Sequence, residues 1–171
     1  MTGPPDPHSD EVDRIVAAWR RERPDLDVAP LEVLSRVTRL ARHLDLARGA
    51  AFAAHGLERW EFDVLAALRR AGEPYELSPG QLTAETLVSS GTMTNRIDRL
   101  ERRRLVRRRP DPDDGRGVLV GLQAQGRELV DTALADLLDR ERTLLAALGP
   151  ADADMLAAAL RRLVGPFDAS S

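Results

Sequence analysis

Side chains that can bond to a nucleic-acid duplex are concentrated in residues 90–103. Hydroxyl, amide and guanidinium groups can donate hydrogen bonds to phosphates and to base edges in a major groove. Apolar residues recur at Met93, Ile97 and Leu100, the i, i+4, i+7 spacing of one helical face. The other face carries the polar set, which is Thr92, Thr94, Asn95, Arg96, Arg99 and Arg103. We predict a DNA-contacting helix; from this helix alone, a solvated arginine-rich surface helix is the alternative.

A turn with helix-capping chemistry precedes this helix. Residues 82–88 suit a short helix and the turn after it. Ser89, Ser90 and Gly91 follow, and small hydroxyl side chains satisfy the free N–H groups at the start of a helix. The segment beginning at Leu77 therefore predicts a helix–turn–helix, with Ser90 included among the DNA-binding residues.

A hairpin is predicted directly after the helix–turn–helix. Residues 105–109 and 118–122 can form strands, and the turn-forming sequence PDPDDGRG separates them. Arg116 lies near the tip between Gly115 and Gly117. An arginine on a narrow tip can enter a minor groove, where the negative potential is enhanced. An ordinary hairpin with a chance arginine is the alternative, but helix, turn, helix and hairpin in this order favour DNA.

The charge distribution supports the same interpretation. Nine arginines fall between Arg96 and Arg116, against five acids, although the whole chain has a net charge of −3. A local basic patch on an acidic chain is typical of a DNA-contacting face.

The run SSGTMTNRIDRLERRRLVRRRPDPDDGRGVLVGL closely resembles the winged helix of the MarR family (multiple-antibiotic-resistance regulators). The similarity extends from about residue 30 to about residue 165. Two positions depart from the family pattern. Family members usually have glycine where Arg103 stands, which predicts a changed helix end because glycine is the usual left-handed cap. They often have a second arginine where Gly115 stands, so Arg116 is left as the sole basic residue of the tip.

A second group of residues could hold a small molecule. Asp63 lies in the apolar stretch WEFDVLAAL, where a buried carboxylate needs a cation or hydrogen bonds. Arg70 follows two helical turns later, and Arg96 or Arg108 could approach in three dimensions. Trp19 adds an aromatic ring with an N–H donor. The set suits a flat anionic ligand. The residues by themselves favour the alternative, a structural ion pair with a core tryptophan.

The resemblance implies more about this group. A urate-responsive subgroup of the MarR family has an extra N-terminal helix, and Trp19, Asp63 and Arg108 match its ligand positions. Arg70 and Arg96 match basic positions of the same subgroup. By this resemblance Trp19 and Arg108 hold urate, while Asp63 responds to the negative charge of the ligand. The pattern also occurs in regulators of other purines and small carboxylates, so a different small carboxylate or phenolic ligand is the alternative.

The elements that position these residues are mostly helical. Besides the DNA-contacting helix, apolar periodicity predicts helices over 10–23, 30–54, 58–71, 124–148 and 150–164. The predicted fold class is mainly α with a small β-hairpin wing, in which a winged helix-turn-helix lobe joins a helical dimerisation lobe. The expected divisions are a flexible tail (1–9), N-terminal helices for dimerisation and the ligand pocket (10–57), a DNA-binding domain (58–123), C-terminal dimerisation helices (124–165) and a tail (166–171).

The flanking helices carry more apolar surface than a small winged helix can cover. We expect a homodimer formed through residues 10–45 and 124–164, with purely intramolecular packing as the alternative. A twofold dimer would read a pseudo-palindromic operator, because its two helices would lie about one turn of DNA apart, ~34 Å. The resemblance implies the same assembly, and a repressor released by its ligand.

Several function classes are disfavoured by composition. The chain has no cysteine, which excludes disulfides and thiolate metal sites, and His8, His43 and His55 lack metal-ligand spacing. We expect no metal, no cofactor and no catalytic residues, since neither a Ser/His/Asp arrangement nor a phosphate-binding glycine loop is present. No apolar run approaches the ~18–20 residues of a membrane helix, and a cytoplasmic protein is expected. A winged helix used only for protein contacts is the remaining rival.

Overall fold

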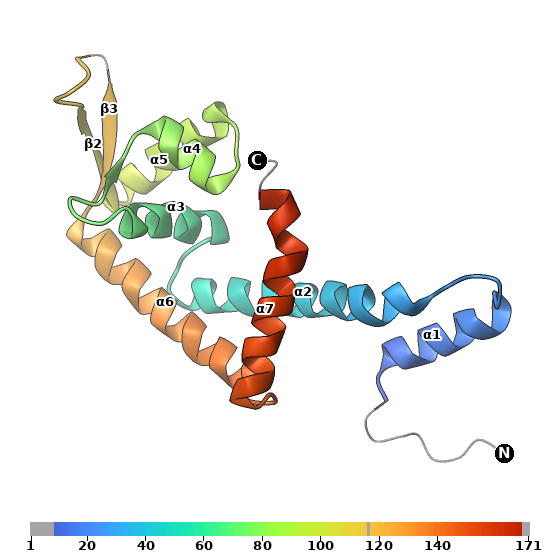
Figure 1. The fold of residues 1–171 in the computed structure, drawn as a ribbon. Coiled ribbons are helices and arrows are strands. Elements are labelled where there is room, and N and C mark those ends of the chain that lie inside the picture. The colour runs from blue at the N-terminus through green and yellow to red at the C-terminus, as the bar shows by residue number, and fades with distance from the viewer. Residues whose placement is uncertain (1–8, 116, 169–171) are drawn as a thin grey trace. The chain divides into compact units, whose positions relative to one another are not determined.

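The computed structural model describes residues 9–115 and 117–168. Their fold is mainly helical with a small antiparallel sheet, which confirms the predicted fold class (Figure 1). Arg116, the residue predicted to enter a minor groove, lies outside the described residues. The elements in chain order are α1 (Glu11–Glu22), α2 (Ala29–Ala54), α3 (Arg59–Arg70), β1 (Glu76–Leu77), α4 (Pro79–Thr86), α5 (Ser90–Arg102), β2 (Val106–Pro110), β3 (Val118–Leu122), α6 (Ala124–Leu145) and α7 (Pro150–Asp168).

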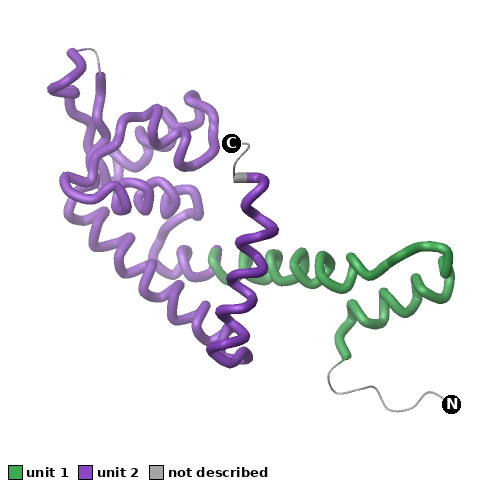
Figure 2. The backbone as a smooth tube through the Cα atoms, in the orientation of Figure 1, with its two compact units in different colours: residues 1–48 green, residues 49–171 purple. Residues whose placement is uncertain are grey.

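The chain divides into two compact units, residues 1–48 and residues 49–171, and α2 passes from the first to the second (Figure 2). In the first unit, α1 packs on α2 around Val12, Val16 and Val28. Ion pairs border this small core, including those from Arg36 to Asp10 and to Asp13, at 2.8 and 2.7 Å. Charged contacts therefore make up much of the α1–α2 interface within this unit.

The second unit is built around α3. Its buried residues Val64, Leu65 and Leu68 pack with residues from α4, α5, β2, β3 and α6. The rings of Phe52, near the end of α2, and Phe62 stack with centroids 4.1 Å apart. This core supports α5 from beneath, so the outward face of α5 is left at the surface.

The sheet has the strand order β1-β3-β2, with antiparallel pairing throughout. The predicted hairpin is β2 and β3, in the register Arg108↔Val120. β1 adds a third strand through Glu76↔Gly121 and Leu77↔Val120. Two residues are too short for an alternating pattern, which explains why the sequence did not indicate β1.

The ends of α5 differ from the predicted ones. The helix begins at Ser90, two residues earlier than expected, because Ser89 caps it and its hydroxyl accepts a hydrogen bond from the Thr92 N–H. The helix-end prediction at Arg103 is wrong. Arg103 keeps right-handed geometry (φ −81°), and the left-handed residue is Arg104 (φ 59°). A side chain at this position costs conformational energy that glycine would avoid.

The remaining helix ends shift by a few residues. α6 ends at Leu145 rather than 148, and α7 continues to Asp168 rather than 164. Among the described residues no single helix has both the length and the apolar composition to cross a membrane. The pair α6 and α7, which is bent by 107°, meets the length and composition requirements only when the two helices are taken together. No cluster of three or more potential metal ligands occurs among the described residues.

Candidate nucleic-acid interface and ligand cavity

The two faces of α5 match the predicted periodicity. Met93, Ile97 and Leu100 are buried, which anchors the inner face. The predicted DNA-binding residues Ser90, Thr92, Thr94, Asn95 and Arg99 are exposed. Arg102, which is not among the predicted DNA-binding residues, is also exposed and lies seven residues after Asn95, on the same helical face. That i, i+7 spacing could have identified Arg102 in advance.

Hydrogen bonds within α5 distinguish its polar side chains. The Thr94 hydroxyl donates to the Ser90 carbonyl at 3.1 Å, and the hydroxyls of Ser89 and Thr92 lie 3.0 Å apart. Their donor capacity is thus partly used inside the helix. The amide of Asn95 carries both donors and an acceptor, the combination that pairs with an adenine edge. Because Asn95 is exposed on this face, base reading by its amide stays a prediction that its chemistry supports.

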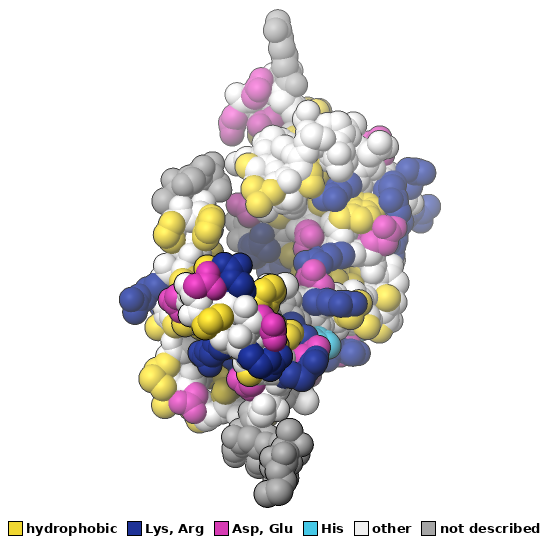
Figure 3. Space-filling view, turned by 90° about the vertical axis from the view of Figure 1, so that its right-hand side faces the viewer, with side chains coloured by type: hydrophobic (Ala, Val, Ile, Leu, Met, Phe, Trp, Pro, Cys, Tyr) yellow, Lys and Arg dark blue, Asp and Glu magenta, His cyan; other side chains and the backbone are white. Residues whose placement is uncertain are grey.

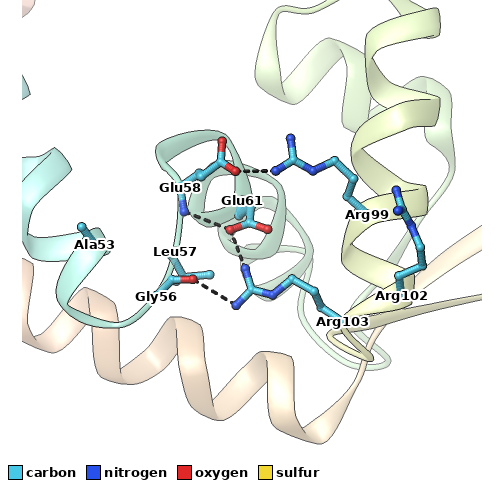
Figure 4. A pocket seen from close by; sticks show the side chains of 8 residues that line it. All are labelled: Ala53, Gly56, Leu57, Glu58, Glu61, Arg99, Arg102 and Arg103. Carbon is cyan, nitrogen blue, oxygen red and sulfur yellow. Dashed lines mark hydrogen bonds and ion pairs between the residues drawn. The ribbon is translucent and has the colours of Figure 1, made fainter.

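Arg103 is exposed, as predicted for the polar face, but its guanidinium is engaged with residues at the start of α3. Its Nη1 donates to Glu61 Oε2 at 2.6 Å and its Nη2 donates to the Gly56 carbonyl at 3.0 Å (Figure 4). The Glu61 carboxylate is buried and also accepts the Glu58 N–H at 2.9 Å. Arg103 therefore connects the end of α5 to the start of α3. Its partner Glu61 lies 42 residues away in the chain, so local sequence could not reveal the pair.

Trp60 contacts two of the predicted DNA-binding arginines. The guanidinium carbons of Arg96 and Arg99 lie 5.5 and 4.7 Å from the centre of its ring, which is cation–π geometry. Arg99 also donates to the Glu58 carboxylate. Arg96 is half-buried, whereas Arg99 is exposed at the border of the outward face.

Arg108, predicted to hold a ligand, binds carboxylates of α5. Its Nη2 lies 2.5 Å from Asp98 Oδ1 and its Nη1 lies 2.7 Å from Glu101 Oε2. Burial lowers the pKa of Arg108, but the hydrogen bonds to Asp98 and Glu101 outweigh it and raise the pKa, so the group stays charged. Arg108 thus links the start of the wing to the helix that would contact DNA.

The predicted residues Asp63 and Arg70 share one cavity between α3 and α4, of about 190 Å³. Asp63 is exposed, so the expectation that it is a buried carboxylate is wrong; Glu61 fills that role on α3. Arg70 pairs with Glu85 at 3.2 Å. The cavity is lined by Phe62, Asp63, Ala66, Arg70, Glu85, Thr86 and Leu87.

Of the five predicted ligand-binding residues, the structure brings Asp63 and Arg70 to one cavity. Arg96 lies against Trp60, and Arg108 lies against α5. Trp19, which is about half exposed, belongs to the other compact unit, so a site that includes it stays a prediction.

A partly buried ion pair supports the wing. Arg109 on β2 reaches across β3 to Glu76 on β1, with Nε–Oε1 at 2.8 Å and Nη2–Oε2 at 2.5 Å. The Glu76 side chain is only 6% exposed. A Cβ on Gly121 would approach the Glu76 carboxylate to 3.1 Å, so the missing side chain makes room for the pair. The hydrogen bonds from Arg109 hold the pKa of Glu76 below its ordinary value.

We expect Glu76→Gln to lower the free energy of unfolding at neutral pH by roughly 1–3 kcal/mol, between the values for exposed and buried ion pairs. Because the pKa of Glu76 is lower in the folded protein than its ordinary value of 4.5, the ion pair stabilises the fold fully at pH values above 4.5. This stabilisation is lost as the pH falls through the lowered pKa of the folded protein. Urea unfolding from pH 7 to pH 3 should therefore show the two proteins converging in acid. Glu22→Gln, at an exposed pair, is the control. A difference that is constant with pH would contradict this assignment.

The profile described as MarR family matches residues 55–117. The chain is 37% identical to the HTH-type transcriptional regulator PecS of Dickeya dadantii (strain 3937) over 153 residues, which cover 90% of this chain and 92% of PecS.

Two solved structures are also similar. The MarR family transcriptional regulator Sco5413 of Streptomyces coelicolor has a TM-score of 0.66 and 27% identity, covering 83% of this chain and 98% of that one. Bordetella bronchiseptica BpsR, whose DNA binding is regulated by 6-hydroxynicotinic acid, has a TM-score of 0.58 and 29% identity, covering 75% of this chain and 98% of BpsR.

Proposed function

This chain belongs to the MarR family of DNA-binding transcriptional regulators, and we propose that it is a homodimeric repressor released from its operator by a small planar anion. Regulators of this family bind DNA and act as dimers. The observation that carries the proposal is the outward face of α5, where Asn95 and Arg102 are exposed beside a two-stranded wing.

Unpartnered apolar surface supports the dimer. On α6 and α7 of the second unit, exposed large hydrophobic residues include Leu134, Leu138, Leu156 and Leu163. Figure 3 shows hydrophobic side chains at the surface among charged ones. Burial of these side chains against a second copy of the chain would remove them from water. A twofold dimer would present two copies of α5 to an inverted repeat, with centres about 34 Å apart.

The proposed ligand is a flat heterocyclic anion, and urate is the first candidate. It rests on the match of Trp19, Asp63 and Arg108 to the urate-responsive pattern. BpsR adds support, because the compound that regulates its DNA binding is a flat aromatic acid. A different small carboxylate or phenolic compound is the alternative ligand.

The contacts of Arg108 suggest how an anion could act at a distance from DNA. Arg108 holds Asp98 and Glu101, both on α5. An anion that draws Arg108 away would leave these two carboxylates without that cation and loosen α5 from β2. Asp63 would be repelled by the incoming charge and would pass the displacement to α3. The ligand releases DNA only if it binds this loosened arrangement more tightly.

We expect saturating urate to weaken duplex affinity by about 5- to 150-fold, the usual range of allosteric coupling. Arg108→Ala and Trp19→Phe should reduce this response because each removes a proposed ligand contact. Asp63→Asn should reduce DNA release more than it reduces ligand affinity. Fluorescence anisotropy of a labelled duplex, with and without ligand, measures each ratio. Arg107→Ala, the neighbouring exposed arginine of β2, is the control and should keep the full response.

Xanthine, hypoxanthine and 6-hydroxynicotinic acid complete the ligand series. A response to one of these but not to urate would keep the site and change the ligand. If none of the four alters duplex affinity, the planar-anion proposal is wrong.

A further inference from the structure

Arg99 has an internal partner where a DNA phosphate would bind. It donates to the Glu58 carboxylate, which comes from the residue just before α3 (Figure 4). It also lies 4.7 Å from the centre of the Trp60 ring. Because Arg99 is exposed and borders the outward face of α5, rotation about its side-chain bonds can direct it either to Glu58 or toward a duplex.

Glu58 is itself held in place. The Trp60 indole donates its N–H to Glu58 Oε2 at 2.7 Å. This hydrogen bond, followed by the one from Arg99, lowers the pKa of Glu58, so the carboxylate stays ionised near neutral pH. A fixed anion facing the arginine that is predicted to meet phosphate occupies that arginine in the DNA-free protein.

We propose that Glu58 is an internal competitor of the DNA backbone for Arg99. In the free protein, Glu58 and Trp60 hold Arg99 against α3. When a duplex binds, a phosphate takes over the guanidinium, and Glu58 returns to solvent. Each binding event therefore includes the breaking of one ion pair per subunit, which lowers affinity for all duplexes. The inference rests on the proposed function, because it requires α5 to meet DNA.

The two neighbouring arginine–glutamate pairs differ in burial, and this difference limits the proposed competition to Arg99. Arg103 is also paired with a glutamate, but that glutamate, Glu61, is buried. The Arg103 guanidinium also donates to the Gly56 carbonyl. That pair is a structural anchor. The Arg99–Glu58 pair lies nearby, yet both side chains are about half exposed, so it can open without unfolding the unit.

The test is a double-mutant cycle on duplex affinity with Glu58→Gln, Arg99→Ala and the double variant. Glu58→Gln should tighten binding by roughly 2- to 30-fold, since two subunits each lose a competing exposed ion pair. In the Arg99→Ala background the same change should have almost no effect, because the competition no longer exists. A gain that persists without Arg99 would reflect only weaker repulsion of phosphate and would overturn the proposal.

A second variant controls for folding. Glu58→Asp keeps a negative charge at the start of α3, which favours the helix, but shortens the side chain that reaches Arg99. It should tighten binding in the same direction as Glu58→Gln, with unchanged thermal stability. If neither variant binds more tightly while the wild type binds the duplex, the competition is absent and the proposed function stands. If the wild type binds no duplex, the proposed function fails first.

Discussion

Gly126→Ala is expected to lower the free energy of unfolding by about 1–3 kcal/mol, a fall in Tm of roughly 2–12 °C. Glycine to alanine within a helix usually stabilises by about 0.5–1 kcal/mol. Here the sign reverses because α6 crosses the start of β2 at this residue. A Cβ on Gly126 would lie 2.2 Å from the Leu105 carbonyl oxygen. That oxygen cannot easily move, since it accepts the Gln123 N–H at 2.9 Å.

Gly49→Ala is the matched control, because Gly49 lies within α2 and a Cβ there meets nothing within 4 Å. It should be neutral or slightly stabilising. Thermal and urea unfolding of both variants measure the effect. Equal stability of the two variants would mean that α6 does not approach β2 as closely as described.

Removal of the Asn95 amide should have the largest effect on recognition. Asn95→Ala is expected to weaken binding to a selected operator by about 2–6 kcal/mol, since a bidentate base contact contributes about 1–3 kcal/mol and a dimer has two. Binding to an unrelated duplex should change little. Arg102→Ala should weaken binding to both duplexes and reduce the salt slope by about 2, as expected for a phosphate contact on each subunit.

The operator for this measurement can be selected from a random duplex pool with the wild-type protein. Glu73→Gln, at an exposed position between α3 and β1, serves as the control and should bind like the wild type. If Asn95→Ala weakens binding to both duplexes equally, Asn95 does not read a base. If it has no effect on either, α5 is not the recognition helix.

Periodic features of this fold could be predicted from sequence. Apolar residues recur at helical spacing at Met93, Ile97 and Leu100, and all three are buried on the inner face of α5. The hairpin was predicted with its second strand at 118–122, the same bounds as β3. Both depend on local patterns, since one repeats every turn and the other flanks a turn-forming segment.

Partners distant in sequence could not be predicted. The apolar neighbours of Asp63 suggested burial, but α3 turns Glu61 inward, where Arg103 meets it from α5. Arg103 looked like an outward residue because its partner lies 42 residues away. Likewise, three consecutive arginines hid which one adopts the left-handed conformation, and only the backbone identifies Arg104.

The most direct test of the account is the salt dependence of binding to an inverted-repeat duplex, measured by anisotropy with the stoichiometry determined at low salt. We expect two chains per duplex. If the dimer makes 6–10 phosphate contacts, affinity should fall by about 10³- to 10⁵-fold between 50 and 200 mM salt, because each contact releases counterions. An affinity that hardly changes over this range, or one chain per duplex, would contradict a dimer that binds DNA through α5 and the wing.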